Sequence, residues 1–289
     1  MAHNVLQDSV LVPPVNPQSG RSFPAVCAAR PTASVSAPRH GTRPSMLEFL
    51  AVVLLAAMLS VGGNTAANAA GALPVVGCAQ EGMAGPIPAP ATIKNVPTIV
   101  PWAAERLAYY ANSALGVLAP RGWHCYGADG SSGGMLIVTP GPIGPENFLS
   151  VAEKGVRGPA VEVEQALGST SGRFEVAQVI AHLFPDFQRF VVKVVREGIE
   201  PASDFPPGPY PNDILVQRSP TDVWFRTPGG TTGMGTQSLL DKGRRPITGA
   251  VMLFPVGMNL ARVAFKLPEA DADLDWAILT QWERSNGVR

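Results

Sequence analysis

Hydrophobic and polar positions form their clearest pattern in the middle of the chain. Residues 123–126 (Trp-His-Cys-Tyr) are typical of a short strand, and residues 135–138 (Met-Leu-Ile-Val) of a buried one. The segment between them contains Asp129-Gly130, a strong turn signal, followed by two serines and two glycines. The pattern predicts a β-hairpin with a flexible, polar tip.

Further segments also have the patterns of strands. Residues 161–164 (Val-Glu-Val-Glu) alternate apolar with acidic side chains, which predicts a strand with one solvated face. Residues 214–218 and 223–227 flank a Ser-Pro-Thr-Asp turn and predict a second hairpin. The strongly apolar residues 248–254 and 260–267 predict a third pairing.

Apolar positions recur at helical spacing in three other regions. Residues 101–118 begin with a proline, a favourable first helical residue, and predict one helix. Residues 174–197 predict two helices, or one helix kinked at Pro185. Residues 271–285 predict a last helix, whose acidic first turn complements the helix dipole.

Composition narrows the fold class. The 289 residues include 30 glycines and 29 prolines, which favours short elements and many loops over a helical bundle. With the patterns above, this predicts an α+β protein: a single compact domain at residues 101–289. In it, three to four helices pack an antiparallel sheet of hairpins with about five or six strands. The Pro-rich residues 70–100 predict an extended arm before that domain.

The start of the chain has the composition of a leader. Residues 1–45 are rich in Pro, Ser and Ala and carry four arginines, which predicts a disordered basic extension. Residues 46–69 contain an apolar run at 47–62, short for a membrane span, and end in Ala-Asn-Ala. We expect a signal peptide cleaved after Ala69, and export to the periplasm or the exterior. Two alternatives stay open: membrane association through an uncleaved single-pass anchor, or a start at Met46.

The three cysteines limit the covalent chemistry. Cys27 lies in the leader, which leaves Cys78 and Cys125 as a pair in a protein bound for an oxidising compartment. We therefore predict a Cys78–Cys125 disulfide that holds the arm on the central hairpin. The alternative is lipidation of Cys78, because residues 75–78 (Val-Val-Gly-Cys) resemble a lipobox.

The polar tip of the central hairpin contains the candidate binding residues Asp129, Ser131 and Ser132. The free N–H groups of such a loop can bind an anion. Alternatively, Ser131 or Ser132 acts as a nucleophile with His124 or His182 as its base, as in a small serine hydrolase. The Gly-x-Ser-x-Gly nucleophile motif is absent, so a plain hairpin is the preferred interpretation.

Other chemical patterns are weaker. Glu162 and Glu164 share a strand face, as an acid–base pair can, but a solvated face is the commoner cause. The glycine-rich residues 228–236 lack the ending of a phosphate-binding loop and predict a mobile loop. The 22 basic and 22 acidic residues balance, and no basic stripe stands out, so we expect no nucleic acid partner. We also expect no metal and no cofactor, because few ligands are available.

Three segments carry a resemblance. Residues 122–127 (Gly-Trp-His-Cys-Tyr-Gly), with the Gly-Ser-Ser-Gly loop that follows, resemble a group of uncharacterised exported bacterial proteins. Residues 171–177 and 198–206 are similar to further segments of that group. The resemblance implies export and no established activity. We expect a non-catalytic envelope or secreted binding or structural module, with the serine hydrolase as the alternative.

Overall fold

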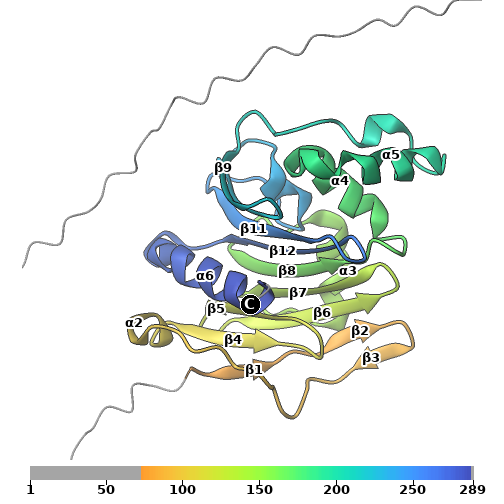
Figure 1. Ribbon diagram of the computed structural model, residues 1–289. Coiled ribbons are helices and arrows are strands. Elements are labelled where there is room, and N and C mark those ends of the chain that lie inside the picture. The colour runs from red at the N-terminus through yellow and green to blue at the C-terminus, as the bar shows by residue number, and fades with distance from the viewer. Residues whose placement is uncertain (1–72, 288–289) are drawn as a thin grey trace, which may run out of the picture. The chain divides into compact units, whose positions relative to one another are not determined.

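The computed structural model describes residues 73–287 (Figure 1). The basic extension predicted at residues 1–45 and the signal peptide or anchor predicted at 46–69 lie outside the described residues. No helix within residues 73–287 is long and apolar enough to cross a membrane.

Nine strands form the larger of two sheets. In spatial order they are β3 (Gly85–Ile87), β2 (Gln80–Gly82), β6 (His124–Gly130), β7 (Gly133–Thr139), β8 (Ala160–Ala166), β12 (Asn259–Lys266), β11 (Ile247–Phe254), β10 (Asp222–Thr227) and β9 (Ile214–Ser219). Neighbouring strands are antiparallel, except that β2 runs parallel to β6. The predicted hairpins β6–β7, β9–β10 and β11–β12 are confirmed, and β8 lies between β7 and β12.

The smaller sheet and the helices cover the larger sheet. The smaller sheet contains β1 (Val75–Gly77), β4 (Leu107–Ala111) and β5 (Gly116–Pro120). The helices are α2 (Pro101–Ala104), α3 (Pro145–Lys154), α4 (Arg173–Leu183), α5 (Gln188–Arg196) and α6 (Asp275–Asn286). A single turn of 3-10 helix that begins at Pro185 separates α4 from α5, so the prediction of a helix break at this proline is confirmed.

Both faces of the central strands are buried. Figure 1 shows α6, β4 and β5 on the near face of the larger sheet. The core on this face includes Tyr110 of β4, Val163 of β8 and Trp282 of α6. The opposite face packs against α4 and α5 through residues such as Ile180 of α4 and Leu260 of β12. Strands covered on both sides must carry apolar side chains at successive positions, as β7, β11 and β12 do.

The helix predicted at residues 101–118 is wrong. The chain forms only the short helix α2 and then the hairpin β4–β5. The reversal is made at Asn112, whose side-chain oxygen accepts hydrogen bonds from the N–H groups of Ala114 and Leu115, at 3.0 and 2.7 Å. Every residue of β4 is buried. A strand in which every position is buried also has buried residues three and four positions apart. The spacing therefore could not distinguish a strand from a helix here.

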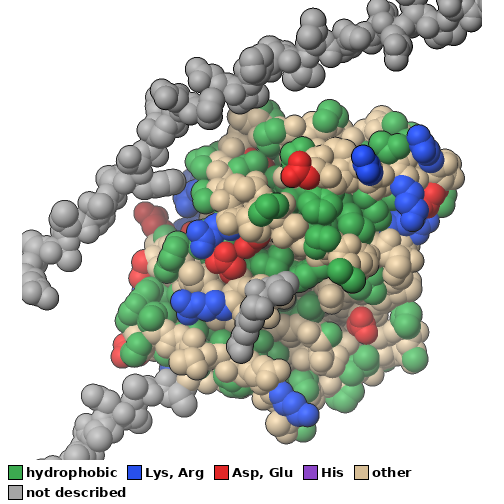
Figure 2. Space-filling model, in the orientation of Figure 1, with side chains coloured by type: hydrophobic (Ala, Val, Ile, Leu, Met, Phe, Trp, Pro, Cys, Tyr) green, Lys and Arg blue, Asp and Glu red, His purple; other side chains and the backbone are tan. Residues whose placement is uncertain are grey.

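The α+β class and the single domain of hairpins packed by helices are confirmed, with more strands than expected. Charged residues make up only 15% of the chain. On the face that Figure 2 shows, charged side chains are few and mostly separated by hydrophobic and uncharged polar surface. Places where several charged side chains come together are therefore informative features of the surface.

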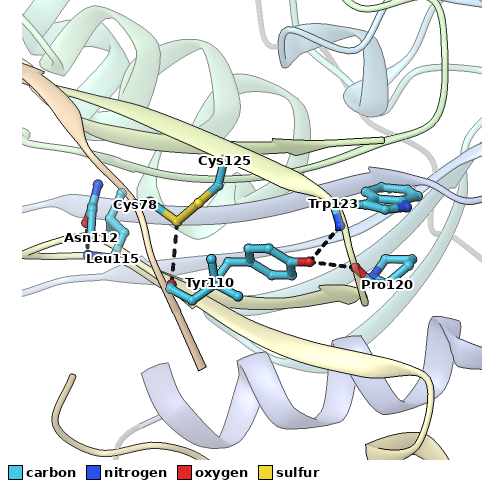
Figure 3. Close-up of a disulfide and its surroundings, with 8 residues drawn as sticks. Cys78, Tyr110, Asn112, Leu115, Pro120, Trp123 and Cys125 are labelled. Atoms are coloured by element: carbon cyan, nitrogen blue, oxygen red, sulfur yellow. Dashed lines mark hydrogen bonds between the residues drawn. A yellow bond between two sulfur atoms is a disulfide. The ribbon is translucent and has the colours of Figure 1, made fainter. Parts of the chain in front are cut away.

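The predicted disulfide between Cys78 and Cys125 is present, with 5.5 Å between the two Cα atoms (Figure 3). Cys78 is buried and its N–H group donates to the carbonyl oxygen of Ala111 in β4, at 2.8 Å. The Tyr110 hydroxyl group beside it donates to the carbonyl of Pro120 and accepts a hydrogen bond from the N–H of Trp123. The bond thus joins the start of the described chain to β6 at the point where both sheets meet.

We expect removal of the disulfide to destabilise the fold. It closes a loop of 47 residues, which corresponds to about 4 kcal/mol in the chain-entropy model. The C78A/C125A double variant should lose about 2–5 kcal/mol of unfolding free energy, measured by urea denaturation. Addition of a reductant should destabilise the parent protein and leave the double variant unchanged. Equal stability of the parent with and without reductant would contradict this role.

Candidate functional site

The loop singled out by the sequence lies at the β6–β7 turn. Ser131 and Ser132 are exposed between the paired residues Gly130 and Gly133, and Asp129, also exposed, pairs with Gly134 just before the turn. The carbonyl oxygen of Ser132 accepts a hydrogen bond from the N–H of Leu167 at 2.8 Å. The turn therefore has the polar, accessible form that was predicted, and one of its carbonyl groups is used to hold the neighbouring chain.

The structure does not bring either histidine to the serines. His124 begins β6, so the length of that strand, about 20 Å, separates it from the turn. Gly172, just before α4, lies against Ser132: a Cβ atom there would collide with the Ser132 carbonyl oxygen. His182 lies near the other end of α4, about 14 Å farther along the helix axis. Neither imidazole can reach a serine hydroxyl without a large rearrangement.

His182 forms an aromatic pair instead. Its ring stacks on Tyr210 with 4.0 Å between the ring centroids. Burial lowers the pKa of His182, so the neutral imidazole is favoured, although Asp213 acts in the opposite direction. Gly208 packs directly on the backbone of His182. These contacts hold the segment around residue 208 against the end of α4, which agrees with a structural role.

The expectation that Glu162 and Glu164 face solvent is wrong. Both lie on the face of β8 that α4 and the chain around Leu239 cover, and Glu162 is only 2% exposed. The Glu162 carboxylate accepts a hydrogen bond from the N–H of Leu239 at 2.8 Å. Arg262 of β12 donates to Glu164 and, at 2.9 Å, to Glu175 of α4. One buried arginine therefore faces three carboxyl groups between the sheet and α4.

Burial changes the acidity of this cluster. It raises the pKa of Glu162 to about 7, with Glu164 acting in the same direction and Arg262 against it. Burial also raises the pKa of Glu175 to about 8. Burial alone would lower the pKa of Arg262, but the three carboxyl groups outweigh it and the pKa is raised. Arg262 therefore keeps its positive charge, and Glu162 and Glu175 bind protons near neutral pH.

An arginine-rich pocket of about 260 Å³ lies where α6 begins, a position that the sequence did not suggest. Its apolar wall is formed by Phe265 and Leu267 at the end of β12. Its basic residues come from two elements that are distant in sequence: Arg226 from β10, and Arg244 and Arg245 from the loop before β11. Below, "arginine pocket" means this hollow, with its lining completed by Pro246, Thr248, Glu269, Ala272 and Asp275.

Two of the three arginines in the arginine pocket are engaged by the protein. Arg226 faces the Asp275 carboxylate at 3.9 Å, and Arg245 donates to the carbonyl oxygen of Leu267 at 2.8 Å. Arg244 is exposed and has no salt bridge within the described chain. Burial raises the pKa of Asp275 to about 6, while Arg226 and Thr248 oppose the shift. The pocket thus combines an apolar wall with guanidinium groups that can bind a carboxylate or phosphate.

A larger hollow of about 620 Å³ lies between the β9–β10 turn, the end of β11 and the end of α6. Asp222 is buried in its wall. Burial is the main cause that raises the pKa of Asp222 to about 7, and contact with Glu283 is the second. Arg218 donates to both oxygens of Glu283, at 3.2 and 3.4 Å. These three residues join the end of α6 to the β9–β10 hairpin.

Comparisons with known proteins identify no relative. No protein-family model, curated protein or solved structure matches the chain. Within residues 73–287, no group of three or more His, Cys, Asp or Glu side chains is placed to hold a metal ion. The site must therefore be judged on its own geometry, as part of a disulfide-bonded α+β domain.

The buried carboxyl groups predict a specific pH dependence. Glu162 and Glu175 bind protons more tightly in the folded chain than at their ordinary pKa of 4.5. Proton binding by these two groups stabilises the folded chain fully below pH 4.5, and this stabilisation is lost as the pH rises through about 7 to 8. For Glu162 alone, the loss is on the order of 3 kcal/mol.

Urea unfolding at pH 5 and pH 8 tests this with Glu162→Gln, which keeps an acceptor for the Leu239 amide but cannot ionise. We expect the parent protein to lose more stability between the two pH values than this variant does. Glu153→Gln, an exposed change on α3, is the control and should behave like the parent. If the parent and Glu162→Gln lose the same stability, Glu162 is not the titrating group.

Proposed function

We propose that the protein is a non-catalytic binding module that acts outside the cytoplasm. The disulfide supports an oxidising, exported location, which is where such bonds persist. Whether the domain is periplasmic, secreted or tethered by an anchor depends on residues 46–69. The separation of His124 and His182 from the β6–β7 serines does not favour the serine hydrolase alternative.

The arginine pocket supports one class of ligand best: a compact molecule with an acidic group and an apolar body. The single observation that carries this proposal is Arg244, an exposed guanidinium beside the apolar wall of Phe265 and Leu267, with no salt bridge within the described chain. Arginine binds carboxylates through two parallel hydrogen bonds, and the wall can take an alkyl or aromatic group. A volume of about 260 Å³ lies just below the usual range for small-molecule sites, which sets a small size limit.

Calorimetric titration of the full chain with octanoate tests this proposal, with octanol as the uncharged control of the same length. We expect octanoate to bind and octanol to bind at least tenfold more weakly, because only the carboxylate can accept hydrogen bonds from Arg244. The Arg244→Gln variant should bind octanoate about tenfold more weakly, since a charge-assisted hydrogen bond contributes about 1.5 kcal/mol or more.

The matched control is Arg284→Gln, which removes an exposed arginine of α6 that does not line the arginine pocket. It should bind octanoate as the parent protein does. Equal affinities for octanoate and octanol, or an Arg244→Gln variant with parental affinity, would show that the pocket does not select an acidic group.

A further inference from the structure

Helix α5 separates apolar and basic residues onto opposite sides. Val191 and Val194 are buried against the core beneath α4. Arg189, Lys193 and Arg196 are all exposed on the other side. Their spacing of four and then three residues places them in one stripe along the helix. We call this stripe the basic face of α5.

No acidic side chain lies within α5 to balance the basic face. The acidic residues that border the helix are Asp186, in the turn before it, and Glu197, directly after it. Glu197 is already paired with Arg173 of α4, at 2.7 Å between nitrogen and oxygen. None of the salt bridges within residues 73–287 involves Arg189, Lys193 or Arg196.

Like charges at this spacing destabilise an isolated helix, so the basic face reduces the stability of α5 unless an anion offsets it. The three cations lie together although the chain as a whole has a formal net charge of zero. Figure 2 shows basic side chains gathered at the end of the molecule where Figure 1 places α5. The earlier expectation that the chain has no basic stripe is therefore wrong, because the helix assembles one from three separated residues.

Exposed apolar side chains accompany the cations. Val192 lies between Arg189 and Lys193 in sequence and is 49% exposed, and Ile199, just beyond the helix, is 64% exposed. A basic helix with apolar residues at its polar boundary is typical of a segment that lies on an anionic membrane surface. No exposed aromatic residue lies on α5 to stack on nucleic acid bases.

We infer that the basic face of α5 docks the domain on an anionic lipid surface, with Arg189, Lys193 and Arg196 against the headgroup phosphates. Val192 and Ile199 then rest at the boundary of the headgroups. The docking surface lies on the side of the larger sheet opposite α6, so it is separate from the arginine pocket. Docking through the basic face of α5 requires anionic lipid, whereas membrane association through the apolar residues 47–62 does not. The two contributions can therefore be measured separately.

Co-sedimentation of the full chain with lipid vesicles tests the docking. One set of vesicles contains phosphatidylglycerol and phosphatidylcholine, and the other contains phosphatidylcholine alone. Binding to the second set measures any contribution that does not depend on lipid charge, including that of residues 47–62. The excess binding to the anionic vesicles measures all charge-dependent binding, and it should fall as the salt concentration rises. The four arginines of residues 1–45 also contribute to it, and every variant retains them, so the share of α5 is the difference between the variants.

The variant R189Q/K193Q/R196Q removes the basic face with a residue of similar helix propensity. Each cation near an anionic surface contributes about fivefold to binding, so we expect the excess partition coefficient to fall on the order of 100-fold. The control variant K94Q/K154Q/K242Q removes three exposed cations from other parts of the fold and changes the net charge equally. It should retain most of the excess binding.

Each of three results would overturn the inference. They are equal binding of the parent protein to both vesicle sets, equal loss of binding in the two triple variants, and parental binding by R189Q/K193Q/R196Q. Full competition by inorganic phosphate, at a concentration equal to that of the lipid phosphate, would assign a site for the free ion and would also overturn the membrane docking. Octanoate binding to the arginine pocket should be the same in all of these variants.

Discussion

Burial of the central strands on both faces is the constraint on which the rest of this structure depends. The strands β8, β12 and β11 lie between α6 and the smaller sheet on one side and α4 and α5 on the other. A charged side chain buried on these strands, such as Arg262, requires a partner inside the protein. One guanidinium nitrogen of Arg262 donates to Glu164 of the neighbouring strand and to Glu175 of α4.

The two covering layers then carry the surfaces available for function. On one side, the start of α6 closes a hollow against the start of β11 and the end of β12 and leaves Arg244 beside an apolar wall. On the other side, α4 is held to the sheet through Glu175, and α5 packs on α4 and presents three cations outward. The central strands are covered on both faces, so the surfaces proposed for recognition lie at strand ends and on the covering helices.

The sequence predicted the local features well, because they depend on neighbouring residues. The turn after Asp129, the break at Pro185 and the pairing of Cys78 with Cys125 each follow from a few residues and their context. The strand β4 was predicted as a helix because a strand buried on both faces loses the alternation that identifies it.

The candidate site was not predictable in the same way. The arginine pocket joins β10, the loop before β11, the end of β12 and the start of α6, so it depends on strand order and register. The burial of Glu162 depends on the covering of its strand face by α4 and the chain around Leu239. The basic face of α5 was missed although a helix was expected there, because the spacing of Arg189, Lys193 and Arg196 was not read against the helical period.

The central claim is that Arg262 holds α4 on the sheet, and α5 through its packing on α4. Residue-resolved hydrogen exchange of an Arg262→Met variant tests it most directly. Removing one partner of a buried ion pair costs about 3–5 kcal/mol, because the remaining charges lose their counter-ion. The account predicts faster amide exchange in α4 and α5, with much smaller changes in β4, β5 and α6. Equal acceleration throughout the described chain, or no acceleration in α4, would contradict it.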